Sequence, residues 1–329
     1  MRHTLAAKGK ILLFVLCVLG LFAGFLYRKY RPPWEFYREL ATVELGESKS
    51  LLGASGSGQR YVKFKQLQGA GFNNQAQEIH LFHHLALLTN RVYVYQPFMW
   101  RHRMELQPLS GFLLGPTQGS LSSQVWDEVC PLEKVKNVTF DAEYEHRWKQ
   151  ATEGLDGPDE CIYVENWILN WGFLESTAIH EIWPEYRKYL HSHYRWPSHI
   201  ADMIHRSQTQ LNLRPEPSST EGEPYLALHF RRGDFEEHCQ HLARTNQSFT
   251  SWTTLPEIQS TSVFPPRLDP FTPSSVVEHC YPDLRRILEA IDAQIRSRPH
   301  IRAIYILHDG ALGPHTSIHS ILSNSICIA

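Results

Sequence analysis

The spacing of apolar and polar side chains predicts a strand–helix–strand unit in the main body of the chain. Residues 61–66 alternate between apolar and polar side chains, which is typical of a strand, and residues 91–95 predict a second strand. Between them, residues 75–89 place apolar side chains at helical spacing. The turn before this helix is rich in glycine, and we expect Asn73 or Asn74 to cap the helix. Such a β–α–β unit belongs in a parallel sheet.

A second unit of the same kind is expected towards the end of the chain. Residues 225–230 form a short apolar run, which predicts a buried strand of a parallel sheet. Residues 283–298 carry a clear apolar stripe at helical spacing, and residues 302–307 predict a further strand. The intervening residues 236–281 contain repeated prolines and predict mostly loop. Two such units make α/β the expected fold class.

An unbroken apolar run without charge occupies residues 11–27. As a helix with a rise of about 1.5 Å per residue it would extend over roughly 26 Å, which is enough for a thin bilayer. We expect an uncleaved signal anchor, with a cleaved signal peptide as the alternative. Residues 28–60 would then form a stem. The glycosylation sequons at Asn137 and Asn246 favour a lumenal main body, so we expect a single-pass type II protein of the endoplasmic reticulum or Golgi membrane.

Composition and cysteine spacing narrow the class of protein. Of the 329 residues, 42% are hydrophobic and 20% are charged, as in a globular protein. The formal net charge of -2 argues against a nucleic-acid partner held by bulk charge. Cys130 with Cys161, and Cys239 with Cys280, are suitably placed for local disulfides in an oxidising lumen. Buried thiols are the alternative.

Candidate chemistry is concentrated where the second apolar strand ends. His229, Arg231 and Arg232 lie there, and Asp234 follows. Ligands of open α/β sheets bind at the carboxyl edge of the strands, and the planar guanidinium group matches phosphate oxygens. A pyrophosphate is therefore the expected ligand. The alternatives are a structural ion pair between Arg232 and Asp234, or an Arg-Gly-Asp adhesion tripeptide.

Two further groups of side chains lie near the first unit. The glycine-rich turn leaves backbone N–H groups at a helix N-terminus, and such groups attract anions. His80, His83 and His84 share one face of the helix, but no carboxylate completes a hydrolase-type set with them, so no metal is expected. Residues 167–173 are rich in aromatic side chains, which predicts buried core, with an acceptor surface as the alternative.

Two short motifs resemble those of one enzyme family. Residues 229–234, His-Phe-Arg-Arg-Gly-Asp, resemble the His-x-Arg-Arg-x-Asp signature of GDP-fucose-dependent fucosyltransferases. Residues 71–75, Gly-Phe-Asn-Asn-Gln, resemble the Gly-Gly-Phe-Asn-Asn-Gln motif that opens the first domain of protein O-fucosyltransferases. The resemblance covers roughly residues 61–307 and is anchored at these two motifs. Some branches carry a Glu just before Gly-Phe-Asn, proposed as the base for the acceptor hydroxyl, whereas Ala70 stands there in this chain.

The resemblance implies an architecture and a reaction. The fold would consist of two Rossmann-like halves that face a cleft, a GT-B-like arrangement, with the second half incomplete. The activity would be an inverting transfer of fucose from GDP-fucose to a Ser or Thr hydroxyl of a protein, without a metal or other cofactor. The alternatives are a fucosyltransferase with a glycan acceptor, and an inactive truncated relative that only binds nucleotide sugar or a partner.

The resemblance also implies roles for individual residues. Arg231 would be the catalytic residue, in contact with the β-phosphate and the glycosidic oxygen, and Arg232 would help to bind the donor. His229 would contact the nucleotide, and Asp234 would hold the guanine or orient the arginines. The opposite wall of the cleft would be lined by Gly71, Phe72, Asn73 and Asn74.

These expectations combine into one domain plan. Residues rich in Pro, Ser and Glu separate the two β–α–β units and predict a hinge. The residues after the last predicted strand show no clear periodicity. The expected parts are a cytoplasmic tail (1–10), a signal anchor (11–27), a stem (28–60), an N-terminal Rossmann-like domain (61–213), a hinge (214–224), a truncated donor-binding domain (225–307) and a tail (308–329).

Overall fold

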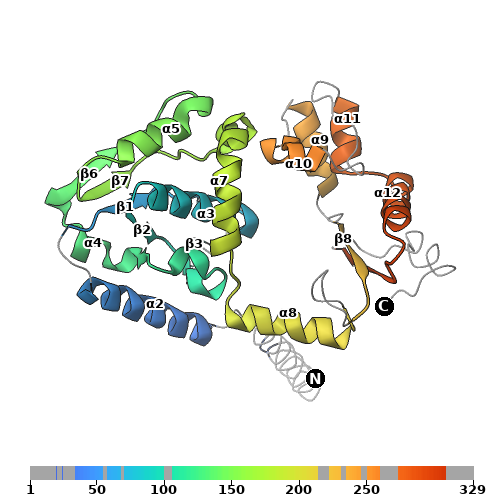
Figure 1. Cartoon of the computed structure of the whole chain (residues 1–329), viewed down its shortest axis with the longest axis horizontal. Helices are drawn as coiled ribbons and strands as arrows, with labels where there is room; N and C mark the ends of the chain where they lie inside the picture. The colour runs from blue at the N-terminus through green and yellow to red at the C-terminus, as the bar shows by residue number, and fades with distance from the viewer. Residues whose placement is uncertain are drawn as a thin grey trace, which may run out of the picture.

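A five-stranded parallel sheet organises the first half of the chain (Figure 1). In this computed structural model its strands are β1 (Tyr61–Phe64), β2 (Val92–Tyr95), β5 (Leu121–Ser122), β6 (Val135–Val138) and β7 (Cys161–Val164). The spatial order is β5-β2-β1-β7-β6, and every neighbouring pair is parallel. Parallel neighbours need crossover connections, and helices are the usual form. The predicted parallel α/β arrangement is therefore confirmed for this half.

Helices cover both faces of this sheet, and each face has its own apolar cluster. The larger cluster contains side chains of α3 (Phe72–Leu88), α5 (Tyr144–Leu155), α6 (Trp171–Glu175) and α7 (Ala178–His193). The smaller cluster contains side chains of α2 (Trp34–Ala54) and α4 (Trp126–Val129). The sheet is thus the middle of three layers, which is the arrangement that buries both faces of parallel strands.

Strand β1 shows how the sequence pattern produces these layers. Successive side chains of a strand point to opposite faces, so Val62 and Phe64 join the larger cluster, where Phe64 stacks on Phe82 with ring centroids 4.3 Å apart. Lys63 points to the other face and places its ammonium 5.3 Å from the ring centre of Trp126. Burial lowers the pKa of Lys63, and the aromatic face partly offsets the loss of hydration.

Residues 34–54 do not form the expected stem. They form helix α2, which packs against one face of the five-stranded sheet. Glu44 is buried and accepts a hydrogen bond from the backbone N–H of Ser110 at 2.6 Å. Ser48, also buried, accepts one from the backbone N–H of Ser122 at 2.9 Å. Besides these polar contacts, Leu45 and Leu52 of α2 pack against the smaller apolar cluster.

The second half contains the predicted strand–helix–strand unit. Strand β8 (Tyr225–Phe230) pairs in parallel with β9 (Ala303–His308), and α12 (Leu284–Ser297) lies between them in sequence. The α12 helix is capped by Asp283, whose carboxylate accepts a hydrogen bond from the backbone N–H of Arg286 at 2.8 Å.

The prediction that β8 is buried is wrong. Its side chains alternate between half-buried and exposed positions, and Ala227 is among the exposed ones. Within the described residues, β8 has one partner strand and its small apolar cluster involves only α12 and β9. A strand covered on one face by a single helix keeps its other face in solvent, whatever the hydrophobicity of its residues.

The prediction of loop over residues 236–281 is also wrong in part. The structure forms α9 (Phe235–Arg244), η5 (Ser251–Thr254), α10 (Pro256–Gln259) and α11 (Pro273–Cys280) there. Leu242 and Ala243 of α9 pack with Val276 of α11, and the disulfide between Cys239 and Cys280 joins the two helices. Prolines at the first positions of α10 and α11 start helices, since a missing N–H costs nothing there.

The remaining elements connect these parts. Helix α8 (Ser198–Gln210) runs from the end of α7 towards β8 and has no buried residue (Figure 1). The short elements are β3 (Phe98–Met99), β4 (Leu106–Gln107), η1 (Leu109–Gly111), η2 (Gly115–Thr117), η3 (Ser123–Val125) and η4 (Leu132–Lys134).

The structure describes residues 20, 24, 34–54, 58–67, 70–99, 106–213, 222–230, 235–245, 250–259 and 273–308. Among these residues no helix is long and apolar enough to cross a membrane. The apolar run 11–27 lies outside them, apart from Gly20 and Gly24. Asn246, most of the predicted hinge and the tail after residue 308 also lie outside the described residues.

Candidate functional site

The Gly-Phe-Asn-Asn-Gln motif forms the first turn of α3, on the loop that follows β1. The predicted cap at Asn73 or Asn74 is wrong: the helix begins earlier, and Gly71 is the cap residue, without a side-chain hydrogen bond. Both asparagines are exposed on the first turn, so their amides are free to face a ligand. The free N–H groups of a helix start give this place a positive potential.

Gln75, the last residue of the motif, is buried and holds the turn in place. Its amide nitrogen donates hydrogen bonds to the carbonyl oxygens of Ala70, at 2.7 Å, and Met99, at 2.9 Å. Its amide oxygen accepts one from the backbone N–H of Met99 at 3.0 Å. The motif thus combines one inward amide that fixes the backbone with two outward amides, and the sequence pattern alone did not separate these roles.

Gly71 is not required by the conformation or packing of the protein. Its φ of -61° and ψ of 157° lie in a region that any residue adopts. A Cβ atom built on Gly71 would meet no described heavy atom within 4 Å. By contrast, a Cβ atom on Gly154 would lie 2.5 Å from a ring carbon of Phe140. The open space beside Gly71 lets a ligand approach the backbone of the turn closely.

Glu78 ties α3 to two loops at the carboxyl edge of the sheet. Its carboxyl group accepts hydrogen bonds from the backbone N–H of Leu67, at 2.6 Å, and from Trp167 Nε1, at 2.5 Å. Burial of the group raises the pKa of Glu78 to about 8, against the lowering effect of these two donors. A Glu on the apolar face of a helix was the available signal for this residue, and the sequence reasoning missed it.

A cavity of about 380 Å³ lies beside the first turn of α3. Its walls come from α3, from α7 and the residue that follows it, and from the segment around η5. Apolar and ring-bearing side chains predominate, with a few side-chain amides at the start of α3. The lining residues are Phe72, Asn73, Ala76, Gln77, His80, Trp183, Tyr186, Leu190, Tyr194, Trp252 and Leu255.

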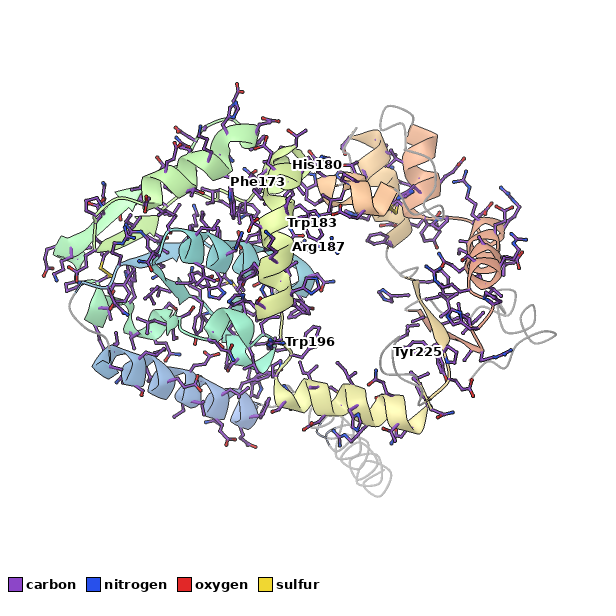
Figure 2. All side chains as sticks on the ribbon, viewed as in Figure 1. Phe173, His180, Trp183, Arg187, Trp196 and Tyr225 are labelled. Carbon is purple, nitrogen blue, oxygen red and sulfur yellow. A yellow bond between two sulfur atoms is a disulfide. The ribbon has the colours of Figure 1, made fainter. Side chains whose placement is uncertain are left out.

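Contacts of α6 and α7 with residues 251–257 hold this wall of the cavity together. The hydroxyl of Ser251 donates to the carbonyl oxygen of Glu175 at 2.6 Å, and Trp183 Nε1 donates to the carboxylate of Glu257 at 3.1 Å. His180 Nε2 lies 2.8 Å from Thr254 Oγ1. Figure 2 shows His180 and Trp183 along the edge of α7 that faces α10. The cavity is therefore shared by segments that are far apart in the sequence.

Three buried histidines of α3 surround Tyr189 of α7. The hydroxyl of Tyr189 lies 2.8 Å from His83 Nδ1 and 3.1 Å from His80 Nδ1. Burial, with the neighbouring His193, lowers the pKa of His80 to about 4 and that of His83 to about 3, and burial lowers that of His84 to about 4. All three rings are neutral near pH 7. In the described part of the chain no group of three His, Cys, Asp or Glu side chains is placed to hold a metal ion.

The structure places only some of the predicted site residues. Gly71, Phe72, Asn73 and Asn74 lie together on the first turn of α3, and Phe72 and Asn73 line the cavity. His229 is exposed near the end of β8. Arg231, Arg232 and Asp234 lie outside the described residues, so their approach to the turn stays a prediction.

The other predicted positions lie away from this turn. The structure joins Cys130 to Cys161 and Cys239 to Cys280, with S–S distances of 2.05 Å. These are the pairs suggested by the spacing. Asn137 is exposed on β6, at the edge of the sheet, where a glycan would have room. In residues 167–173 both environments occur, because Trp167 and Trp171 are exposed while Phe173 is fully buried.

Comparison with known proteins gives a distant likeness. No protein-family model and no curated protein matches the sequence. Among solved structures, the chain is similar to POFUT1 in its apo form, with 16% sequence identity and a TM-score of 0.47 over 84% of this chain and 86% of that chain. It is similarly related to POFUT1 in complex with GDP-fucose, at 15% identity and a TM-score of 0.48 over 84% and 85% of the two chains. POFUT1 in complex with GDP shows the same values. At this identity and TM-score the likeness does not establish a shared activity.

Proposed function

We propose that this chain is an inverting glycosyltransferase that moves fucose from GDP-fucose to a Ser or Thr hydroxyl of a protein. The sequence support is the presence of two motifs that resemble one family, at residues 71–75 and 229–234. The structural observation that carries the proposal is the position of Asn73. This residue is exposed on the first turn of a helix at the edge of a parallel sheet, and it lines a cavity. Nucleotide-sugar sites of α/β proteins are built at this kind of edge.

In the proposed reaction the bond between fucose C1 and the β-phosphate oxygen breaks, and its electron pair leaves with GDP. A new bond forms between C1 and the acceptor oxygen on the opposite face, and the proton of the acceptor hydroxyl is released to water. Negative charge grows on the leaving diphosphate, so fixed positive charge at that oxygen lowers the barrier. Arg231 would supply this charge, without a metal ion. His229 would contact the nucleotide, and the turn at Gly71 would form the opposite wall.

The test of the proposal is a substitution at Arg231. Transfer from labelled GDP-fucose to protein and peptide acceptors should fall by about 10²–10³-fold in Arg231→Ala, as expected for loss of one group that stabilises developing charge. Arg244→Ala is the matched control, because Arg244 is an exposed arginine of α9 outside the motif. Circular dichroism must show that both variants are folded. Full turnover by Arg231→Ala would refute the role, and transfer to glycans alone would redirect the proposal to a glycan acceptor.

The proposed compartment is the lumen of the endoplasmic reticulum or Golgi, with the chain anchored as a type II membrane protein by residues 11–27. Support comes from the sequons and from two disulfides, which persist in oxidising compartments. Expression in cells with Asn137→Gln provides the test. Loss of a glycan from this exposed site should increase the electrophoretic mobility of the protein. An unglycosylated wild-type chain would count against a lumenal location.

A further inference from the structure

The cavity beside the first turn of α3 has an aromatic and uncharged lining, and the role proposed for Arg231 at the diphosphate does not account for it. Six of its lining residues carry aromatic or imidazole rings. Among the lining residues that the structure describes there is no Asp, Glu, Lys or Arg. A charged group such as a diphosphate would lose its hydration there without a counter-charge, at a large cost in free energy. The ligand that suits this lining is therefore neutral.

Two residues that line the cavity each carry a buried ring nitrogen without a described hydrogen-bond partner, which favours a ligand with polar groups of its own. In the part of the chain that the structure describes, neither His80 Nε2 nor Trp252 Nε1 has a hydrogen-bond partner, although both atoms are buried. His80 is only 2% exposed, and its other ring nitrogen is engaged by the hydroxyl of Tyr189. Buried polar atoms without partners are uncommon in native proteins. They are expected where a bound molecule completes the hydrogen bonds.

A hydroxyl group is the simplest partner for these two atoms. Because the pKa of His80 is lowered to about 4, its ring is neutral and one of its nitrogens lacks a proton. A hydroxyl both donates and accepts, so it can pair with His80 Nε2 in either tautomer, and it can accept from the Trp252 indole N–H. The amides of Asn73 and Gln77 at the start of α3 offer further partners for a ligand with several hydroxyls.

The walls offer aromatic faces and edges to a ring-shaped ligand of moderate size. The Trp183 and Trp252 rings meet edge to face with centroids 5.7 Å apart, and Tyr186 lies 5.8 Å from Trp252. The volume of about 380 Å³ is near the lower end of the roughly 300–1,000 Å³ found for small-molecule sites. Aromatic walls with a few convergent polar groups are the usual composition of such sites.

We propose that this cavity binds a neutral sugar ring, with its C–H face against Trp183 and Trp252 and one hydroxyl on His80 Nε2. The ring has two possible sources, the hexose of the nucleotide-sugar donor or a sugar of the acceptor. Only this question of source rests on the proposed transferase function, because sugar binding needs no turnover. Aromatic side chains of a peptide acceptor are a different class of ligand, and the test treats them as a contrary outcome.

Binding is tested by ligand-observed NMR on the full chain with three neutral probes. The probes are methyl α-fucopyranoside, methyl β-glucopyranoside and N-acetyltyrosinamide. We expect saturable binding of at least one glycoside, and at least a tenfold weaker affinity in Trp183→Ala. Trp171→Ala is the matched control, since Trp171 is an exposed tryptophan that does not line the cavity, and its affinity should be unchanged. His80→Phe keeps a ring but removes the nitrogen, and should weaken binding at least threefold.

The second arm identifies the source of the sugar. Competition between GDP-fucose and the glycoside, with no competition from GDP, would indicate the donor hexose. Simultaneous binding of GDP-fucose and the glycoside would indicate the acceptor. Either result supports a sugar site.

Three results would overturn the proposal. They are no saturable glycoside binding, equal affinity in wild type and in a folded Trp183→Ala, and binding of the tyrosine probe alone. Should Trp183→Ala fail to fold by circular dichroism, His80→Phe alone decides. Glycoside binding without any fucose transfer would refute the proposed function and support the sugar site. Fucose transfer without glycoside binding would support the proposed function and refute the sugar site.

Discussion

Gly71 offers the most direct test of a ligand at the first turn of α3. The structure predicts that Gly71→Ala leaves the fold intact, because the backbone lies in a region open to all residues and the new methyl group meets no described atom within 4 Å. Replacing a glycine in an unstrained conformation reduces the entropy of the unfolded chain, which favours folding by about 0.4–1 kcal/mol. Because alanine is a poorer helix cap than glycine, this gain is largely offset at Gly71, and we expect the free energy of unfolding to change by less than about 1 kcal/mol.

The same methyl group would occupy the space through which a diphosphate reaches the backbone of the turn. Close approach to a phosphate is one of the roles of glycine in nucleotide-binding turns. We expect the Kd for GDP, measured by calorimetry at fixed salt, to increase at least tenfold, which corresponds to about 1.4 kcal/mol.

Gly46→Ala is the matched control for this substitution. Gly46 lies in helix α2, and a Cβ atom there also meets nothing within 4 Å. This variant should stabilise the protein by about 0.5–1 kcal/mol and leave GDP affinity unchanged. Unchanged GDP affinity in a folded Gly71→Ala would refute the placement of the diphosphate at this turn. A large loss of stability would instead contradict the packing described around it.

Three further predictions concern stability. Removing the disulfide by Cys239→Ser with Cys280→Ser should lower the free energy of unfolding by about 4 kcal/mol, given the sequence separation of 41. Amide hydrogen exchange should become faster in α9 and α11 but not in the five-stranded sheet, and unchanged protection of the two helices would contradict this. Glu78 holds its proton up to about pH 8 when folded and only up to about pH 4.5 when unfolded, so wild-type stability should fall as pH rises from about 6.5 to 8, above the range in which the buried histidines titrate. Glu78→Gln should reduce this slope in thermal unfolding, and an unchanged slope would contradict the burial of the carboxyl group. His83 stays neutral down to about pH 3 when folded, whereas the unfolded ring gains a proton below about pH 6.5, so His83 should make the protein less stable as the pH drops from 6.5 to 3. In urea titrations, His83→Phe should reduce the dependence of the unfolding free energy on pH by up to about 1.4 kcal/mol per pH unit. An unchanged pH dependence would contradict the burial of this ring.

The residue pattern by itself determined the strands of the two β–α–β units, the helix within each unit and the fold class. Alternation in β1 and the apolar stripe of α12 are visible in sequence because each depends on neighbours only a few residues away. The parallel pairing of β1 with β2, and of β8 with β9, follows from the same units. The two disulfide pairs could be suggested for a similar reason, since each closes a modest loop.

Only the tertiary structure decided what covers each face. Helix α2 packs through Leu45 and Leu52, and also through buried Glu44 and Ser48, whose polar side chains give no apolar signal. β8 has the composition of a buried strand yet keeps one side in solvent, because burial depends on how many layers surround a strand. Hydrophobic periodicity identifies the face of an element, but it does not identify the partner.

The candidate site divides in the same way. The motif at residues 71–75 marked the place, but the inward role of Gln75 and the cavity wall at Trp252 depend on contacts between segments far apart in the chain. Such contacts involve single side chains and leave no repeat in the sequence. The burial of His80 beside Tyr189 has the same origin: a histidine at helical spacing is polar in the sequence, and only the packing of α7 onto α3 makes it neutral.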